Sequence, residues 1–353
     1  MIRKRRVKLV GCTLAVLLCC SQIVVAAPRS VGYPIRTMGT YANVTIVTAD
    51  STASAAAAHL AHARFLWVDS LMTNWTATSE VARINREAAA GPVHLHPEVA
   101  RVVETALRVG RESDGAFDIT VEPLVRLWGF LGGPKRVPAA SEIATAFEHV
   151  GPQHLTYEPS EQRLRFDRHG VRIDLGGIAK GNAVDRATEA LRTAGVHDAL
   201  VDLSGNMYAL GSPSTSRAWR IGVRDPRDRI PYFARLSLSE QGISTSGKYE
   251  QFVAQNGRTY GHIMDPRSGQ PAEGLIAVTV VAPTAMEADA WSTSLFVLGP
   301  AAARAKAKAR TDIDAILITP GSAGVDTVWV ERSLKDRFAL DDKSKGIFQL
   351  IWY

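Results

Sequence analysis

The stretch IDLGGIAKGNAVD, residues 173–185, decides the fold class. Its first three residues alternate between apolar and acidic, as in a short strand, and Gly176 and Gly177 follow directly. Apolar residues then recur with helical spacing, so we expect a helix over 179–194 with Lys180 in its first turn. Paired glycines let backbone approach a ligand, and a helix start with a lysine favours phosphate. An ordinary strand-to-helix turn that needs glycine is the alternative.

Helices and strands interleave along the rest of the 353 residues without a regular βαβ repeat. This order predicts an α+β fold, in which a mixed sheet core is covered by packed helices. One compact unit after residue 30 is favoured, and two lobes are left open because the chain exceeds the usual size of one domain. Residues 164–175 are expected to form two short strands around a His169–Gly170 turn. Further strands are expected at 41–48, 199–203, 234–238, 275–281 and 313–318, and helices at 51–71 and 99–113.

The positive charge of the chain is concentrated at its N-terminus. Five of the basic residues that make up the net charge of +6 lie in the first eight positions, and residues 1–26 contain no acid. The remaining chain therefore carries a net charge of only +1. A basic patch for nucleic acid is excluded on this ground.

These basic residues precede an apolar run from Leu9 to Val25 and the small residues Ala26 and Ala27. This order is typical of a secretory signal peptide, so we predict that residues 1–26 are removed and that 27–353 form the exported domain. An uncleaved membrane anchor is the alternative. All three cysteines of the chain lie before residue 21, so the mature domain would contain no disulfide, thiolate metal site or cysteine nucleophile.

A second segment, EADAWST at residues 287–293, carries groups suited to a metal ion. Thr284 and Glu287 have the spacing of a capping box, which predicts a helix start. Asp289 and Thr293 are four residues apart and would project from one face of that helix. A carboxylate and a hydroxyl at this spacing suit Mg²⁺, which also recruits phosphate oxygens. A solvated aspartate and a threonine bonded to its own helix would look the same in sequence.

Three other segments place polar groups near turns. Residues 115–118, GAFD, follow a predicted helix, and residues 261–266, GHIMDP, place His262 before a proline turn. A histidine in such a position is often structural. Residues 244–247, STSG, are expected to form either a backbone cradle for anionic oxygen or an ordinary turn.

In this order the segments resemble the ApbE family, the FAD:protein FMN transferases. The similarity extends over roughly residues 35 to 300. It includes the further stretches TMGT at 37–40, Trp75 before SE at 79–80, RIN at 83–85 and DLSGN at 202–206.

The resemblance implies a T-fold-like architecture and an exported, periplasmic, Mg²⁺-dependent enzyme. Such an enzyme splits FAD, transfers FMN to a Thr or Ser hydroxyl of an acceptor protein, and releases AMP. The partners would be FAD and that acceptor, with peripheral contact with the inner membrane left open. The implied FAD-site residues are Met38, Trp75, Ala116, Phe117, Asp118, Asp174, Lys180 and Ile263. The implied metal ligands are the Gly177 carbonyl, Asp289, Thr293 and the Ser292 backbone.

His262 is the candidate catalytic residue, because it precedes Ile263 and an imidazole can act as general base for the acceptor hydroxyl. Two departures from the family pattern are Ser204 with Asn206, where glycine and an acid are frequent, and Lys248, where an acid or amide is usual. The chain has no Asp-Gly-x-Thr/Ser-Gly-Ala-Thr acceptor motif, so self-flavinylation is not expected. A metal-dependent FAD diphosphatase and a non-catalytic exported flavin-binding protein are the alternatives.

Overall fold

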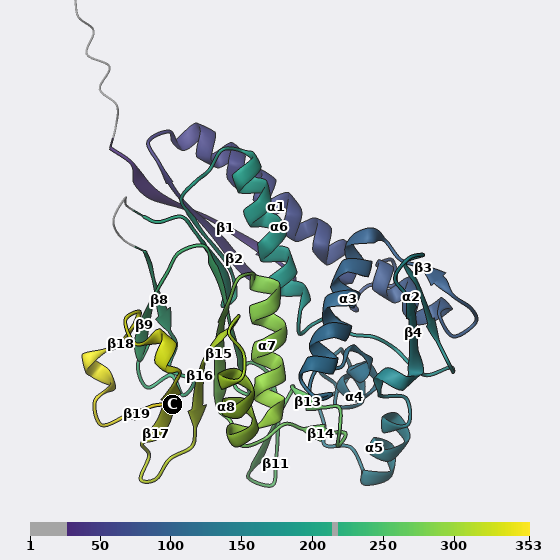
Figure 1. The fold of residues 1–353 in the computed structure, drawn as a ribbon. Coiled ribbons are helices and arrows are strands. Elements are labelled where there is room, and N and C mark those ends of the chain that lie inside the picture. The colour runs from purple at the N-terminus through teal and green to yellow at the C-terminus, as the bar shows by residue number, and fades with distance from the viewer. Residues whose placement is uncertain (1–26, 214–217) are drawn as a thin grey trace, which may run out of the picture.

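A computed structural model describes residues 27–213 and 218–353, so the predicted signal peptide at residues 1–26 lies outside the described residues. A nine-stranded sheet forms the centre of the molecule, in the order β1-β2-β6-β7-β10-β15-β16-β17-β19 (Figure 1). Its neighbouring strands are antiparallel except for the parallel pair β17–β19. The bounds are β1 Arg29–Thr37, β2 Thr40–Thr48, β6 Ala199–Leu203, β7 Asn206–Leu210, β10 Gln241–Gly247, β15 Ala277–Ala282, β16 Asp314–Thr319, β17 Asp326–Val330 and β19 Phe348–Trp352.

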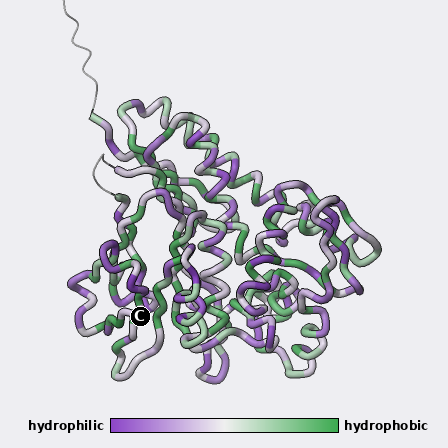
Figure 2. Tube along the Cα trace, in the orientation of Figure 1, coloured by the Kyte–Doolittle hydropathy of each residue, from purple (hydrophilic) through white to green (hydrophobic). Residues whose placement is uncertain are grey.

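Both faces of this sheet are covered. Side chains on one face, such as Val278 and Val280, share a core with the helices α1 (Ser51–Met72), α6 (Ala179–Thr193), α7 (Ala285–Leu298) and α8 (Pro300–Lys308). Side chains on the other face, such as Ala277 and Val281, pack against a small sheet of β8 (Trp219–Val223), β9 (Ala234–Leu238) and β18 (Phe338–Leu340). Because successive side chains of a strand point to opposite faces, β15 is buried along its whole length. Figure 2 shows hydrophobic positions gathered in the central strands.

A smaller lobe lies beside the sheet and carries its own hydrophobic cluster, which includes Leu124, Trp128 and Ile143 (Figure 1). The β11–β12 hairpin and the β13–β14 pair join the two parts, because Val253 and Met264 belong to the same cluster. The remaining elements are α2 Glu80–Glu87, β3 Val93–His94, α3 Pro97–Glu112, η1 Ile119–Val121, α4 Glu122–Leu127, α5 Ala140–Phe147, η2 Pro152–His154, β4 Leu155–Glu158, β5 Arg163–Phe166, β11 Phe252–Gln255, β12 Arg258–Gly261, β13 Met264–Asp265, β14 Gln270–Pro271, η3 Arg332–Leu334 and η4 Asp342–Ser344.

The expected α+β class is confirmed, but one predicted strand is wrong. The first strand expected within 164–175 is β5, whereas residues 171–175 pair with no other strand. They are extended, and the side chain of Asn85 bonds to the backbone of Ile173 in place of a neighbouring strand. In the part of the chain that the structure describes, no helix is both long and apolar enough to span a bilayer.

The start of α7 is fixed by two side chains. Thr284 accepts a hydrogen bond from the Glu287 N–H at 3.1 Å, as predicted, but the Glu287 carboxylate pairs with Arg108 instead of completing the capping box. Asp185 of α6 caps two further N–H groups of the first turn, because those of Ala285 and Met286 donate to it at 2.8 and 2.9 Å. This cap joins α6 to α7 and brings their site residues together.

Candidate functional site

A cavity of about 690 Å³ opens where α6, α7 and the end of β10 face the smaller lobe. All but one of the predicted site residues line it. These are Met38, Trp75, Ala116, Phe117, Asp118, Asp174, Gly177, Lys180, His262, Ile263, Asp289 and Thr293. The exception is Ser292, which is fully buried behind the cavity wall, with its hydroxyl bonded to the hydroxyl of Ser246.

His262 follows β12 and is held through the backbone of Gln251. The His262 N–H donates to the Gln251 carbonyl at 3.1 Å, and the imidazole Nδ1 lies 3.3 Å from the same oxygen. Because a carbonyl oxygen only accepts, Nδ1 carries the proton in this contact and the neutral ring keeps a free lone pair on Nε2. Burial, together with the positive charge of Lys180, lowers the pKa of His262 to about 4. The imidazole is therefore neutral at pH 7 and can accept a proton.

Asp289 is a buried carboxylate on α7. Its Oδ2 accepts a hydrogen bond from the Gly181 N–H at 2.9 Å, which ties it to the first turn of α6. Burial raises the pKa of Asp289, while the charge of Lys180 acts in the opposite direction. A buried carboxylate with so few partners is stabilised by a cation.

The oxygen groups around Asp289 fit a hard divalent cation. Thr293 lies one helical turn further along α7 and also lines the cavity. A Cβ placed on Gly177 would lie 3.4 Å from the Thr293 hydroxyl, so the Gly177 backbone passes close beside it. Carboxylate, hydroxyl and carbonyl oxygens are the ligands that Mg²⁺ prefers. The described residues contain no group of three or more His, Cys, Asp or Glu suited to a metal, so Mg²⁺ here would also need anionic oxygens from a substrate.

Gly177 leaves little room for a side chain beside Phe117. A Cβ at this position would lie 3.2 Å from the ring of Phe117, in addition to its approach to Thr293. The Asp118 carboxylate is bonded to a residue two positions along the chain. Its Oδ1 accepts hydrogen bonds from the N–H and the hydroxyl of Thr120, each at 2.8 Å. Burial raises the pKa of Asp118. Ala116, Phe117 and Asp118 of the GAFD segment thus form one wall of the cavity.

Two residues flank the mouth of the cavity. Trp75 is 65% exposed, and its ring lies against the backbone at Gly132, so it offers a free π-face to a flat ring. Met38 and Gly39 both have positive φ, 49° and 70°, in the tight turn between β1 and β2. This turn carries Met38 to the cavity edge.

The structure adds residues to which the sequence assigned no role in the site. Asn74 lines the cavity, and its amide donates to Asp174 Oδ1 at 3.2 Å, which positions that carboxylate. Ser246 also lines the cavity, within β10, so the expected turn or cradle at residues 244–247 is in fact a strand. In the sequence, Ser246 belongs to the STSG stretch and Asn74 stands directly before Trp75, but neither pattern shows which distant group the side chain bonds.

The departures from the family pattern lie away from the cavity wall. Ser204 adopts a φ of 53° in the β6–β7 turn, a left-handed conformation that favours glycine. Asn206 accepts a hydrogen bond from the Ser244 hydroxyl at 2.7 Å. Lys248 follows β10, and its Cβ approaches Gly261.

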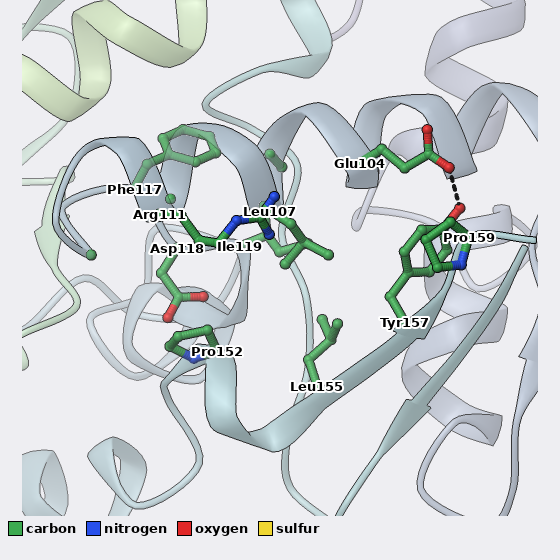
Figure 3. Close-up of a pocket in the computed structure, with 13 residues that line it drawn as sticks. Glu104, Leu107, Arg111, Phe117, Asp118, Ile119, Pro152, Leu155, Tyr157 and Pro159 are labelled. Carbon is green, nitrogen blue, oxygen red and sulfur yellow. Dashed lines mark hydrogen bonds between the residues drawn. The ribbon is translucent and has the colours of Figure 1, made fainter.

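A second cavity of about 510 Å³ lies between α3 and β4 and shares Phe117 and Asp118 with the first. Figure 3 shows Glu104 and Tyr157 joined across one end of it, where the Tyr157 hydroxyl donates to Glu104 at 2.6 Å. Its other lining side chains are mainly apolar, with Arg111 from α3 beside them. It lacks the combination of base, lysine and hydroxyls found in the first cavity, which is therefore the candidate active site.

Comparisons with known proteins identify the family to which this chain belongs. The model of the ApbE family matches residues 38–317. A relative from Klebsiella pneumoniae (strain 342), "FAD:protein FMN transferase", is 34% identical over 305 residues, which cover 84% of this chain and 87% of the relative. A relative of the same description from Escherichia coli (strain K12) is 34% identical over 277 residues, covering 76% and 78%.

Solved structures of ApbE proteins also match this chain. The flavin transferase ApbE from Vibrio cholerae has a TM-score of 0.77 at 29% identity and covers 88% of this chain and 99% of its own. The ApbE protein of Thermotoga maritima has a TM-score of 0.80 at 28% identity, with the same coverage. The chain therefore belongs to the ApbE family of flavin transferases.

Proposed function

We propose that this enzyme transfers the FMN moiety of FAD to a Thr or Ser hydroxyl of an acceptor protein, with Mg²⁺ bound and with release of AMP. The observation that carries the proposal is the neutral imidazole of His262, with Nε2 free, in the same cavity as Asp289, Thr293 and Lys180. A base, a fixed positive charge and a set of hard oxygen ligands together suit attack on a diphosphate.

In the proposed reaction the acceptor hydroxyl oxygen forms a bond to the FMN phosphorus, and the bond from that phosphorus to the bridging oxygen breaks. AMP leaves with the bridging oxygen and the electron pair of the broken bond. His262 Nε2 takes the hydroxyl proton, because Nδ1 is already committed to the Gln251 carbonyl. Mg²⁺, held by Asp289, Thr293 and the Gly177 carbonyl, would neutralise the charge that develops on the leaving AMP.

Lys180 adds a positive charge that is fixed by the fold. It lies in the first turn of α6 and forms no ion pair with any residue that the structure describes. The positive charge of Lys180 acts to lower the pKa of His262 and that of Asp289, in the second case against the larger effect of burial. An ammonium group left without a carboxylate partner in the cavity is suited to bind a diphosphate oxygen.

The acceptor would approach over residues 250–252. These three consecutive residues are exposed, and Gln251 directly contacts His262. Phe252 is 48% exposed and would offer the acceptor an apolar contact beside Gln251. The acceptor and this enzyme would meet outside the cytoplasm, in the periplasm, if residues 1–26 act as the export signal that their sequence predicts.

The direct test is incubation of the mature chain, residues 27–353, with FAD, Mg²⁺ and an acceptor protein. FMN attached to a Thr or Ser of the acceptor, with stoichiometric AMP, is the expected result. Free FMN with AMP and no modified acceptor would identify the protein as a diphosphatase instead. Intact FAD that stays bound would leave only the flavin-binding role.

A further inference from the structure

A chain of hydroxyl groups lies directly behind Asp289 and Thr293. The Ser246 Oγ is 3.2 Å from the Thr293 hydroxyl and 2.9 Å from the Ser292 Oγ. Ser292 in turn lies 3.3 Å from the Ser244 Oγ, which donates to the Asn206 side chain. We refer to Ser244, Ser246, Ser292 and Thr293 as the hydroxyl chain. Ser244 and Ser292 are almost fully buried, and Ser246 is 9% exposed where it lines the cavity.

The proton positions along this chain can be ordered. The Ser292 hydroxyl donates to the Asp289 backbone carbonyl at 3.0 Å, with Ser244 Oγ as a more distant acceptor at 3.3 Å, so the Ser292 oxygen is free to accept from Ser246. When Ser246 donates to Ser292, the Ser246 oxygen is in turn free to accept from Thr293. The hydrogen bonds then run in one direction, from Thr293 through Ser246 and Ser292 to the carbonyl.

Thr293 differs in this respect from other hydroxyl residues inside helices. Thr188 of α6 and Ser294 of α7 donate to the carbonyls four residues earlier, at 2.8 and 2.7 Å. This back-bonding is the usual arrangement for a buried helical hydroxyl. The corresponding carbonyl for Thr293 belongs to Asp289; it accepts from Ser292, whereas the Thr293 hydroxyl is paired with Ser246 Oγ at 3.2 Å. Ser246 is therefore the acceptor that the fold provides for the Thr293 proton.

We propose that Ser246 is a positioning residue for the metal site. By accepting the proton of Thr293, it leaves the oxygen lone pairs of that hydroxyl directed into the cavity, where a cation can bind them. A hydroxyl whose proton has no other acceptor turns the proton toward the cavity and repels a cation there. This inference rests on the proposed function, which places Mg²⁺ at Asp289 and Thr293.

The test measures metal binding rather than turnover. Mn²⁺ is titrated into the mature protein with FAD present and no acceptor protein, because the site needs substrate oxygens as well as its own, and the free ion is followed by electron paramagnetic resonance. We expect Ser246→Ala to weaken Mn²⁺ binding by about tenfold or more, the usual effect of losing a partner of a metal ligand. The matched control is Ser294→Ala, which removes a buried hydroxyl from the same helix but outside the hydroxyl chain, and it should leave Mn²⁺ affinity unchanged.

A double-mutant cycle separates this role from a loss of packing. In a Thr293→Val background, Ser246→Ala should have no further effect on Mn²⁺ affinity, because the hydroxyl that it orients is gone. Ser246→Cys keeps most of the volume but accepts hydrogen bonds poorly, so it should weaken binding even if the alanine variant does not fold.

Two results would overturn the inference in different ways. Equal Mn²⁺ affinity in the wild type and in the Ser246 variants, with loss in Thr293→Val, would show that Ser246 does not orient Thr293. A wild-type protein that binds no Mn²⁺ even with FAD present would overturn the metal assignment of the proposed function itself.

Discussion

The side chain of Asn85 serves Ile173 as a neighbouring strand would. The Ile173 N–H donates to Asn85 Oδ1 at 2.7 Å, and Asn85 Nδ2 donates to the Ile173 carbonyl at 3.0 Å. Asn85 Nδ2 also reaches the Asn74 side chain at 3.1 Å, and Asn74 holds Asp174. Residues 171–175 can therefore remain unpaired with any strand and still present Asp174 to the cavity at a fixed position.

Replacing this amide should destabilise the whole domain. Asn85→Ala leaves the buried N–H of Ile173 without a partner, while the Ile173 carbonyl keeps the Asn74 amide at 3.1 Å, at a cost of about 2 kcal/mol in the free energy of unfolding. Asn85→Asp keeps an acceptor for that N–H but loses the donor to the Asn74 oxygen and the Ile173 carbonyl, so it should also lower the free energy of unfolding. Urea unfolding of the three proteins provides the measurement. Equal midpoints for the wild type and the alanine variant would contradict the strand-like role.

His262→Asn tests the general base. Asparagine can still bond to Gln251 but cannot take a proton, so kcat for FMN transfer should fall by roughly 10²–10⁴-fold. The affinity for FAD and the melting temperature should change little. Normal turnover in a variant of lowered melting temperature would instead assign His262 a structural role.

The pH profile provides an independent test of the same residue. With a pKa lowered to about 4, His262 is in its basic, neutral form throughout the range above pH 5. The ratio kcat/KM for FAD, which reports on the free enzyme, should therefore show no histidine limb between pH 6 and 8 and should fall only toward pH 4. A limb near pH 6.5, the ordinary value for histidine, would show that the imidazole is not desolvated in the working enzyme.

Asp289→Asn should separate metal binding from folding. Loss of the charged ligand should weaken Mg²⁺ binding by well over tenfold. Because burial raises the pKa of Asp289, the ionised carboxylate is unfavourable in the metal-free protein. The metal-free variant should then be at least as stable as the wild type in thermal unfolding. Unchanged Mg²⁺ affinity would remove Asp289 from the ligand set.

Asp185 should contribute to the pH dependence of stability. Burial raises its pKa from 3.8 to about 6, against the opposing effect of the two N–H groups that it caps. A raised carboxyl pKa adds stability below pH 4, and that contribution is lost as the pH rises to about 6. The shift of about two units corresponds to roughly 3 kcal/mol. The difference in unfolding free energy between pH 4 and pH 7 should change by about this amount in Asp185→Asn, and an unchanged difference would contradict the assignment.

Phe252→Ser should affect the acceptor and not FAD. If the acceptor crosses residues 250–252, the variant should have a several-fold higher KM for the acceptor protein and an unchanged affinity for FAD. Leu340→Ser is the matched control, because Leu340 is also exposed, at 37%, but lies in the small sheet on the other face. Equal acceptor KM values in the wild type and the Phe252 variant would place the docking surface elsewhere.

The sequence by itself determined the elements whose pattern is local. Apolar spacing predicted α1, α3 and α6, and the β-branched run at 275–281 predicted β15. The side chains of a helix or a strand repeat at a fixed interval, so a short window contains the whole signal. The order of short motifs also indicated the family resemblance, and twelve of the site residues that it implied line one cavity.

Only the tertiary structure decided the contacts that hold this site in place. Asn85 and Ile173 are 88 residues apart, Asp185 and Ala285 are 100 apart, and Ser246 and Thr293 are 47 apart. The small polar residues at 244–247 resemble a turn in sequence but form a strand, because β15 lies beside them and pairs with their backbone. A hydrogen bond depends on the position of both partners, and no local pattern specifies which distant group the fold will bring within 3 Å.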